Sequence, residues 1–157
     1  MKAMQTWLDE YAVSHQNPLN KTIHWICIPL IYFSVMGLLW SVPISLFQLG
    51  PVPGNLALII IALVFLYYSL MSFSLAIGML LFSSLCGLVC FKIVQLQPNF
   101  ISLWLLCIIV FVLAWIGQFY GHSVEGKKPS FLKDLQFLMI GPAWLMSFIY
   151  KKVGIKY

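Results

Sequence analysis

The sequence predicts an all-α polytopic membrane protein, a bundle of four spanning helices, from its composition and from the length of its apolar runs. Of the 157 residues, 62% are hydrophobic and only 8% are charged, and the mean hydropathy is +0.96. A soluble domain carries roughly 25% charged residues to cover its surface. An apolar run of about 20 residues can cross a bilayer as a helix. We therefore expect one integral-membrane domain over residues 1–157.

An amphipathic helix is expected first, within residues 1–21. Five of its residues recur at helical spacing and form one apolar stripe: Met4, Trp7, Leu8, Tyr11 and His15. Such a helix lies in the membrane interface. The segment lacks the continuous apolar core of a cleaved signal peptide. Because a residue before proline avoids the α region, Asn17-Pro18 predicts a break that lets this helix fold back over the first span.

Four spans are expected next. Their predicted ranges are 23–40, 56–71, 74–94 and 100–119. The run from Leu56 to Val94 has one charge, Lys92, and is about twice the length that one span needs, so we divide it into two antiparallel helices. The uncharged stretch 41–55, rich in proline and glycine, is expected to be a loop.

The number of spans decides where the histidines lie. With four spans before residue 120, His15, His24 and His122 emerge on the same face of the membrane, whereas three spans would place His122 on the opposite face. Lysine placement favours four, because only Lys92 then lies on the far side from the N-terminal lysines. Positively charged residues favour the cytoplasm, so the shared face is expected to be cytoplasmic.

The last apolar stretch, residues 132–150, is short and contains Gly141-Pro142. A full crossing would carry the three C-terminal lysines to the outside, against the usual bias. We expect a re-entrant segment or a fifth span.

The charge of the chain indicates its partners. The formal net charge of +5 comes from lysines alone, without arginine. In a membrane protein such a balance is typical of contacts with anionic lipid headgroups, so membrane lipids are expected as partners and nucleic acid is not. The four cysteines lie in apolar runs and are expected to be small buried hydrophobic residues.

The three histidines are candidate metal ligands, because neutral imidazole is the commonest protein ligand for metals. Glu125 follows His122 at helical spacing, so it is a candidate fourth ligand or a residue that orients an imidazole. Three imidazoles suit iron or zinc, and a carboxylate would favour iron(II) oxygen chemistry. The alternative is that the histidines are solvated interfacial side chains.

Several polar residues near the histidines are candidates for contacting the substrate or for holding the ligands. These are Tyr11, Asn17, Asn20, Gln118, Lys127 and Lys128. The two asparagines are expected to hold imidazoles or a substrate carboxylate. The lysine pair is expected to contact headgroups or to anchor an acidic lipid.

Two motifs resemble those of a known family. The first has the form H-x-N-P-x-N-x-x-x-H…P and spans His15 to Pro29, and the second, Q-F-x-G-H-x-x-E-x-x-x-P, spans Gln118 to Pro129. The family is named for the metabolism of phytosphingosine to odd-numbered fatty acids. Its characterised eukaryotic members are iron(II)-dependent dioxygenases of the endoplasmic reticulum that shorten 2-hydroxy fatty acids by one carbon.

The resemblance implies an enzyme in which His15, His24 and His122 bind Fe(2+), with O2 as co-substrate and a long-chain 2-hydroxy fatty acid as substrate. A zinc-dependent membrane lipid hydrolase and a non-catalytic, lipid-binding scaffold are the alternatives. A homodimer stays open. The bacterial inner membrane and the endoplasmic reticulum both fit, with the site on the cytoplasmic side.

Overall fold

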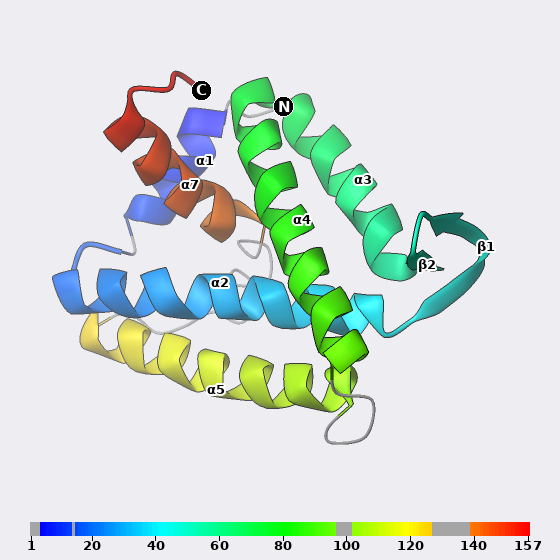
Figure 1. Ribbon diagram of the computed structural model, residues 1–157. Coiled ribbons are helices and arrows are strands. Elements are labelled where there is room, and N and C mark those ends of the chain that lie inside the picture. The colour runs from blue at the N-terminus through cyan, green and yellow to red at the C-terminus, as the bar shows by residue number, and fades with distance from the viewer. Residues whose placement is uncertain (1–3, 14, 97–101, 127–138) are drawn as a thin grey trace.

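The structure is a computed structural model, which describes residues 4–13, 15–96, 102–126 and 139–157. Lys127, Lys128 and the start of the predicted 132–150 segment lie outside these residues. The described elements are shown in Figure 1. In chain order they are α1 (Met4–Ala12), α2 (Pro18–Trp40), β1 (Pro43–Leu49), β2 (Val52–Asn55), α3 (Leu56–Ser69), α4 (Phe73–Leu96), α5 (Leu103–Val124) and α7 (Ile140–Val153).

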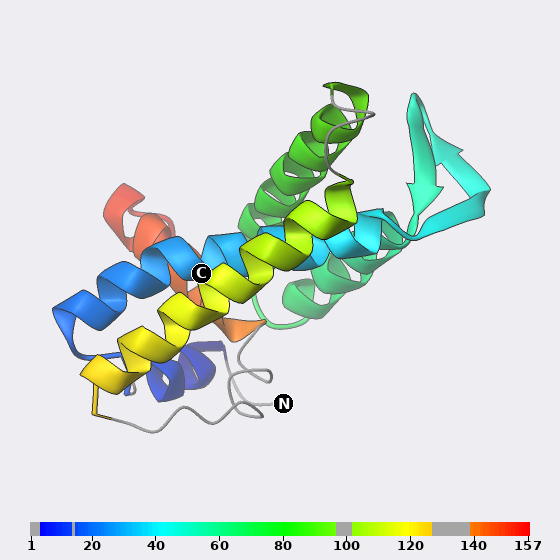
Figure 2. The ribbon, with the colours of Figure 1, turned by 90° about the horizontal axis from the view of Figure 1, so that it is seen from below.

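Helices α2 and α5 lie side by side and antiparallel, as Figures 1 and 2 show from two directions. Glycines on α5 allow this close contact. A Cβ atom at Gly121 would lie 2.5 Å from Oδ1 of Asn20, and one at Gly117 would lie 2.7 Å from Sγ of Cys27. Small residues let membrane helices approach closely. The start of α2 and the end of α5 are therefore neighbours.

Three helices among the described residues are long and apolar enough to cross a membrane, namely α2, α4 and α5. This supports a membrane protein. Helix α3 is apolar but has only 14 residues, which at 1.5 Å per residue is about 21 Å, short of the ~30 Å hydrocarbon core. The predicted division of the long apolar run is confirmed, because α3 and α4 are separate helices. The number of spans stays a prediction.

The described residues are mostly helical, as expected, but the loop predicted for residues 41–55 is wrong in part, because this stretch forms a β-hairpin. Strands β1 and β2 pair antiparallel, with Leu49 opposite Val52, and Gly50 takes a φ of 57° at the turn. Prolines within this stretch argue against a strand, but an edge strand tolerates a residue without an N–H. A two-stranded sheet consists of edges only, so the prolines are accommodated.

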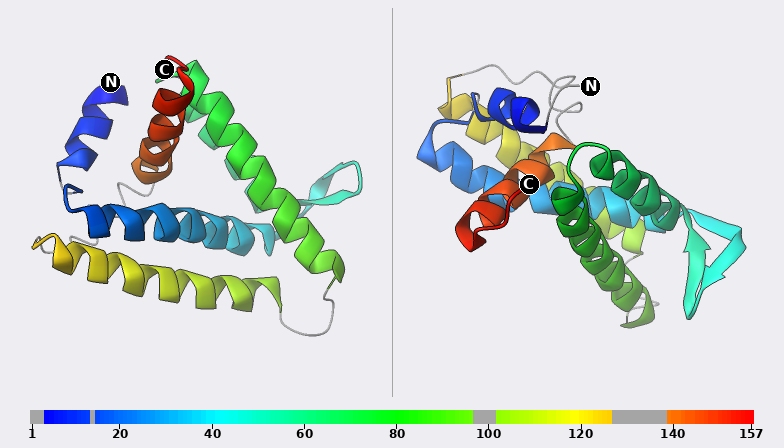
Figure 3. Two further views of the ribbon diagram at one scale, coloured as in Figure 1. Left: turned by 60° about the vertical axis from the view of Figure 1, so that its left-hand side comes forward. Right: turned by 90° about the horizontal axis from the view of Figure 1, so that it is seen from above.

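The N-terminal break is confirmed. Helix α1 ends at Ala12, residues 15–17 are not helical, and α2 begins at Pro18, so the helix expected within residues 1–21 is shorter. Helices α1 and α7 lie over the N-terminal half of α2, while α3 and α4 lie toward its other end (Figure 3). The apolar stripe of α1 packs against α7, with Leu8 and Tyr11 buried.

Candidate metal centre

His24 is placed by the second turn of α2 and is buried. Its Nδ1 lies 2.9 Å from the carbonyl oxygen of Asn20, one turn earlier. A carbonyl oxygen can only accept, so Nδ1 carries the proton of this hydrogen bond. The lone pair of the neutral ring is then on Nε2, which is the arrangement that metal-binding histidines use.

His15 lies in the linker between α1 and α2 and is also buried. Its Nδ1 donates to the carbonyl oxygen of Tyr11, at 2.7 Å. The imidazole stacks on the Tyr11 ring, with centroids 4.1 Å apart and planes within 12° of parallel. His15 therefore adopts the same tautomer as His24, again with Nε2 as the potential ligand atom.

His122 lies in the last turn of α5 and completes the cluster. Its ring centroid is 5.0 Å from that of His24 and 5.4 Å from that of His15, and the His15 and His24 centroids are 4.3 Å apart. One potential ligand nitrogen from each ring lies within 4.8 Å of the other two. Metal–nitrogen bonds of about 2.1 Å require nitrogen separations of about 3–4 Å, so small side-chain rotations would bring all three onto one ion.

The burial of the cluster fits a metal ion better than solvated histidines. All three rings are at least 94% buried, with exposed fractions of 2%, 1% and 6%. Charged imidazoles this close together would repel one another and would lack water. Three neutral rings, each with a nitrogen lone pair near those of the other two, are instead a suitable set of donors for a transition metal. Among the described residues, this is the one group of three or more candidate ligands that converges.

Glu125, just after α5, is a bridge between the segments that carry the histidines. Its Oε1 accepts the backbone N–H of Gln16 at 2.8 Å, and its Oε2 accepts the N–H of Asn17 and the Nδ2–H of Asn20, both at 2.9 Å. Desolvation raises the pKa of the Glu125 carboxyl. The hydrogen bonds and the nearby His15 together lower this pKa by more than desolvation raises it, so the pKa lies below its ordinary value. The carboxylate thus joins α5 to the chain on both sides of the N-terminal break.

The two asparagines stabilise the start of α2. Asn17 is its N-cap, and its side chain accepts the N–H of Leu19 at 2.9 Å. Asn20 is fully buried, packs against Gly121 and donates to Glu125. Both residues therefore support the histidine cluster through the start of α2, and Asn20 does so directly through the carbonyl that accepts from His24.

The remaining predicted residues are placed less centrally. Gln118 is buried one turn before His122 on α5. Tyr11 lies against His15, so it is part of the cluster wall. Lys127 and Lys128 lie outside the described residues.

Sequence reasoning missed Trp144 of α7, whose ring centroid lies 5.4 Å from that of His15 and 5.2 Å from that of Tyr11. It is separated from both by more than a hundred residues of chain, and a tryptophan in an apolar run carries no signal of its own. Gly141-Pro142, at the start of the same helix, was the nearest sequence feature.

Known proteins resemble this chain over most of its length. The family model described as 2-hydroxy-palmitic acid dioxygenase Mpo1-like matches residues 1–153. The chain is 30% identical over 152 residues to the 2-hydroxy-palmitic acid dioxygenase MPO1 of Saccharomyces cerevisiae (strain ATCC 204508 / S288c), a match that covers 94% of this chain and 80% of the relative. No solved structure matches significantly.

Both matches support a role related to 2-hydroxy fatty acid dioxygenases. The family match also includes both motifs that carried the resemblance in the sequence. The chain therefore belongs to the 2-hydroxy-palmitic acid dioxygenase Mpo1-like family.

Proposed function

We propose that this protein is an iron(II)-dependent dioxygenase that shortens long-chain 2-hydroxy fatty acids by one carbon. The observation that carries the proposal is the convergence of three buried imidazoles, His15, His24 and His122, in a chain of this family. They come from three separate segments, so their meeting is a property of the fold and not of local spacing.

The three histidines would hold the metal, His15 and His24 through Nε2, because their Nδ1 atoms donate to backbone carbonyls. Iron(II) held by these three imidazoles would supply the redox chemistry with O2 and would bind the adjacent hydroxyl and carboxylate oxygens of the substrate. The chain itself supplies burial, which excludes water from the reacting atoms, and fixed ring orientations.

Glu125 is assigned to orienting the ligands and not to binding the metal as a fourth ligand. Both of its carboxylate oxygens accept N–H donors from the segment 16–20. Binding a metal would require Glu125 to give up some of these hydrogen bonds, which hold His15 and His24 near His122. Asn17 and Asn20 act with it through the start of α2.

The substrate proposal follows from the relative and from the membrane setting. The yeast relative is named for 2-hydroxy-palmitic acid, and the apolar helices of this chain suit an acyl tail that stays within lipid. Gln118 and Tyr11 are proposed to contact the polar end of such a substrate, and Lys127 and Lys128 are proposed partners for its carboxylate. The site would face the cytoplasm.

The test is turnover by protein purified without oxygen and loaded separately with iron(II) or zinc. The iron(II) form is expected to consume O2 and convert 2-hydroxyhexadecanoic acid to the acid with one carbon fewer, while hexadecanoic acid, which lacks the hydroxyl, should not react. The assay should also include the three single His→Ala variants, which should be inactive.

Two outcomes would replace the proposal. Stoichiometric zinc with full activity on a lipid ester would favour the zinc hydrolase. Normal membrane insertion with no turnover of any 2-hydroxy acid, together with wild-type behaviour of all three histidine variants, would favour the lipid-binding scaffold.

A further inference from the structure

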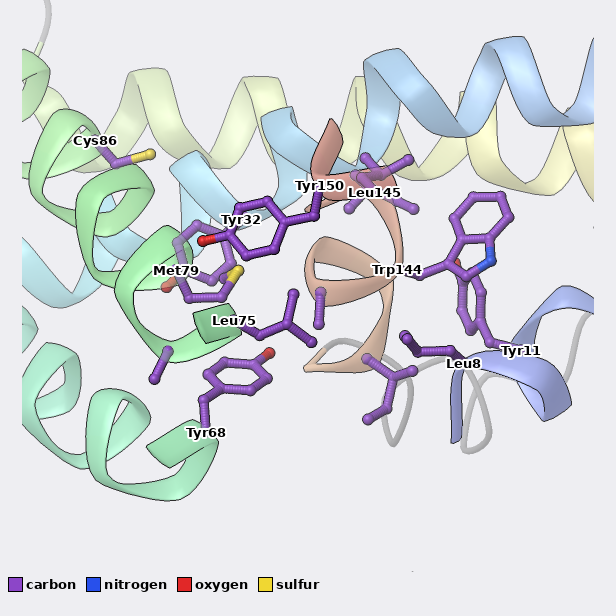
Figure 4. Close-up of a cluster of buried hydrophobic side chains, with 14 of the residues drawn as sticks. Leu8, Tyr11, Tyr32, Tyr68, Leu75, Met79, Cys86, Trp144, Leu145 and Tyr150 are labelled. Carbon is purple, nitrogen blue, oxygen red and sulfur yellow. The ribbon is translucent and has the colours of Figure 1, made fainter. Parts of the chain in front are cut away.

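We propose that Trp144 of α7 is a positioning residue for His15, so that the C-terminal helix completes the metal centre. The inference rests on the proposed metal site. Trp144 would act through His15 and Tyr11 by fixing the imidazole of His15 against His24 and His122. Figure 4 shows Trp144 and Tyr11 side by side at the contact between α7 and α1.

His15 needs such support because it lies outside the two long helices that carry the other ligands. Its backbone N–H donates to Ala12 at 3.0 Å and its Nδ1 donates to Tyr11 at 2.7 Å. Both partners belong to α1. These hydrogen bonds therefore fix the ring relative to α1 and leave its position relative to α2 and α5 to be set by other contacts.

Helix α7 is the surface on which α1 rests. Tyr11 packs on Trp144 with a centroid distance of 5.2 Å, and Leu8 belongs to the same buried cluster. A Cβ atom at Gly141 would lie 3.3 Å from the Tyr11 hydroxyl, so the bare backbone of α7 leaves space for that ring. The position of α1, and with it of His15, follows the position of α7.

Helix α7 is itself fixed to the rest of the bundle. The hydroxyl of Tyr150 donates to the carbonyl oxygen of Ser74 on α4 at 2.7 Å, and the Tyr68 hydroxyl of α3 donates to the carbonyl of Met139. At its start, Gly141 packs against Ile28 of α2. Trp144 therefore connects His15, in the linker between α1 and α2, to a helix that contacts α2, α3 and α4.

The ring of Trp144 contacts the rings of both Tyr11 and His15, so its role differs from that of an ordinary core residue. Trp144 is buried, with an exposed fraction of 3%. Its ring packs against Tyr11, which itself stacks on His15, and its centroid lies 5.4 Å from that of the His15 ring. Glu125 accepts the backbone N–H groups of Gln16 and Asn17, which follow His15 in the chain. His15 is thus fixed relative to α5 through its neighbours and relative to α7 through an aromatic contact.

The experiment measures binding of Co(2+), a spectroscopic probe for the iron site, to purified apo-protein carrying Trp144→Phe or Trp144→Leu. Both replacements are apolar and bulky, but only phenylalanine keeps a ring for Tyr11 and His15. We expect Trp144→Leu to weaken Co(2+) binding about 10–100-fold, as losses behind a metal ligand usually do, with a changed visible spectrum. Trp144→Phe should retain most of the affinity and the wild-type spectrum.

The matched control is Trp104→Leu, which removes a half-exposed tryptophan of α5 that lies 18 residues before His122, about 27 Å along the helix. It should bind Co(2+) as the wild type does. Equal affinities and spectra for Trp144→Leu and wild type would overturn the proposal, and so would equal losses in Trp144→Leu and Trp144→Phe. A wild type that binds no Co(2+) would contradict the proposed metal site. A wild type that binds Co(2+) and a Trp144→Leu variant that binds it equally well would contradict only the role of Trp144.

Discussion

Two of the three histidines hold their rings in the same way. Nδ1 of His15 donates to the carbonyl of Tyr11 and Nδ1 of His24 donates to the carbonyl of Asn20, in each case four residues earlier. A hydrogen bond to one ring nitrogen fixes both the tautomer and the orientation of a ligand histidine. The backbone of each segment thus orients its own histidine ring, with Nε2 left as the candidate ligand atom.

Glu125→Gln is the most informative single change beside the ligands. The carboxylate accepts from Gln16, Asn17 and Asn20, whereas glutamine would direct an NH2 group at one or more of these donors. We expect metal affinity to fall about 10–100-fold, as for other residues that orient ligands. Titration of apo-protein with Co(2+) measures this.

The exposed Glu10→Gln on α1 is the control for the loss of one charge, and it should bind as the wild type does. A loss in Glu125→Gln as complete as that caused by His24→Ala would show that Glu125 is a ligand. No loss at all would show that the bridge does not support the site.

The separation of α1 from α2 has more causes in the structure than the proline that predicted it from the sequence. Pro18 cannot donate to a preceding turn, Asn17 caps α2, and Glu125 accepts the N–H groups of Gln16 and Asn17. These groups would otherwise bond to the end of α1. The separation of α1 from α2 therefore has three independent supports.

We accordingly expect Pro18→Ala alone to leave metal affinity nearly unchanged. Adding Asn17→Ala removes the cap, which typically costs about 1 kcal/mol, and the double variant should bind Co(2+) at least about tenfold more weakly because His15 is released from its place. Asn55→Ala, which removes the cap of α3, is the control. A large loss in Pro18→Ala alone would mean that the proline is the main support.

The contact between α2 and α5 depends on glycine beside the site. A methyl group at Gly121 would lie 2.5 Å from Oδ1 of Asn20, so Gly121→Ala must move either Asn20 or the helices. Overpacking of this kind typically costs about 1–3 kcal/mol, and here it also separates His24 from His122. We expect lower thermal stability and a weaker metal site.

Thermal unfolding in detergent and Co(2+) titration measure the two effects. The control is Ser123→Ala, which lies on an exposed position two residues further along α5. A Gly121→Ala variant with unchanged stability and affinity would contradict the close approach of α2 and α5.

The features that could be predicted are those that depend on short-range patterns. The stripe of α1 and the break at Asn17-Pro18 follow from spacing and from the stereochemistry of proline. The β-hairpin could not be predicted, because prolines and a lack of alternation conceal strands. Trp144 could not either, since only the packing of α7 on α1 brings it to His15.

At the level of the whole molecule, the meeting of the histidines was a topological prediction. It required an even number of crossings between His24 and His122, and the observed antiparallel pair of α2 and α5 places them at the same end. The predicted range 56–71 is close to that of α3, Leu56–Ser69, because one apolar run of twice the length of a span requires a turn near its middle. How the described helices cross the bilayer is left to a direct test.

The topology prediction concerns single cysteines in a chain whose native cysteines have been replaced. Labels at Gln5, Ser72 and Ser123 are expected on one face of the membrane, and a label at Ser45 in the hairpin on the other. Impermeant thiol reagents applied to sealed vesicles of known orientation measure this. Gln5 and Ser123 on opposite faces would exclude a shared site, and Ser72 on the face of Ser45 would show that α3 does not cross.

The central claim, one iron bound by three imidazoles, is tested most directly by X-ray absorption at the iron edge of anaerobically loaded protein. The chain has three histidines, so every imidazole detected has a known source. We expect three imidazoles at about 2.1 Å in the wild type, two in each single His→Ala variant that retains iron, and three in Glu125→Gln. Fewer than three in the wild type, or an unchanged number in the His→Ala variants, would contradict the account.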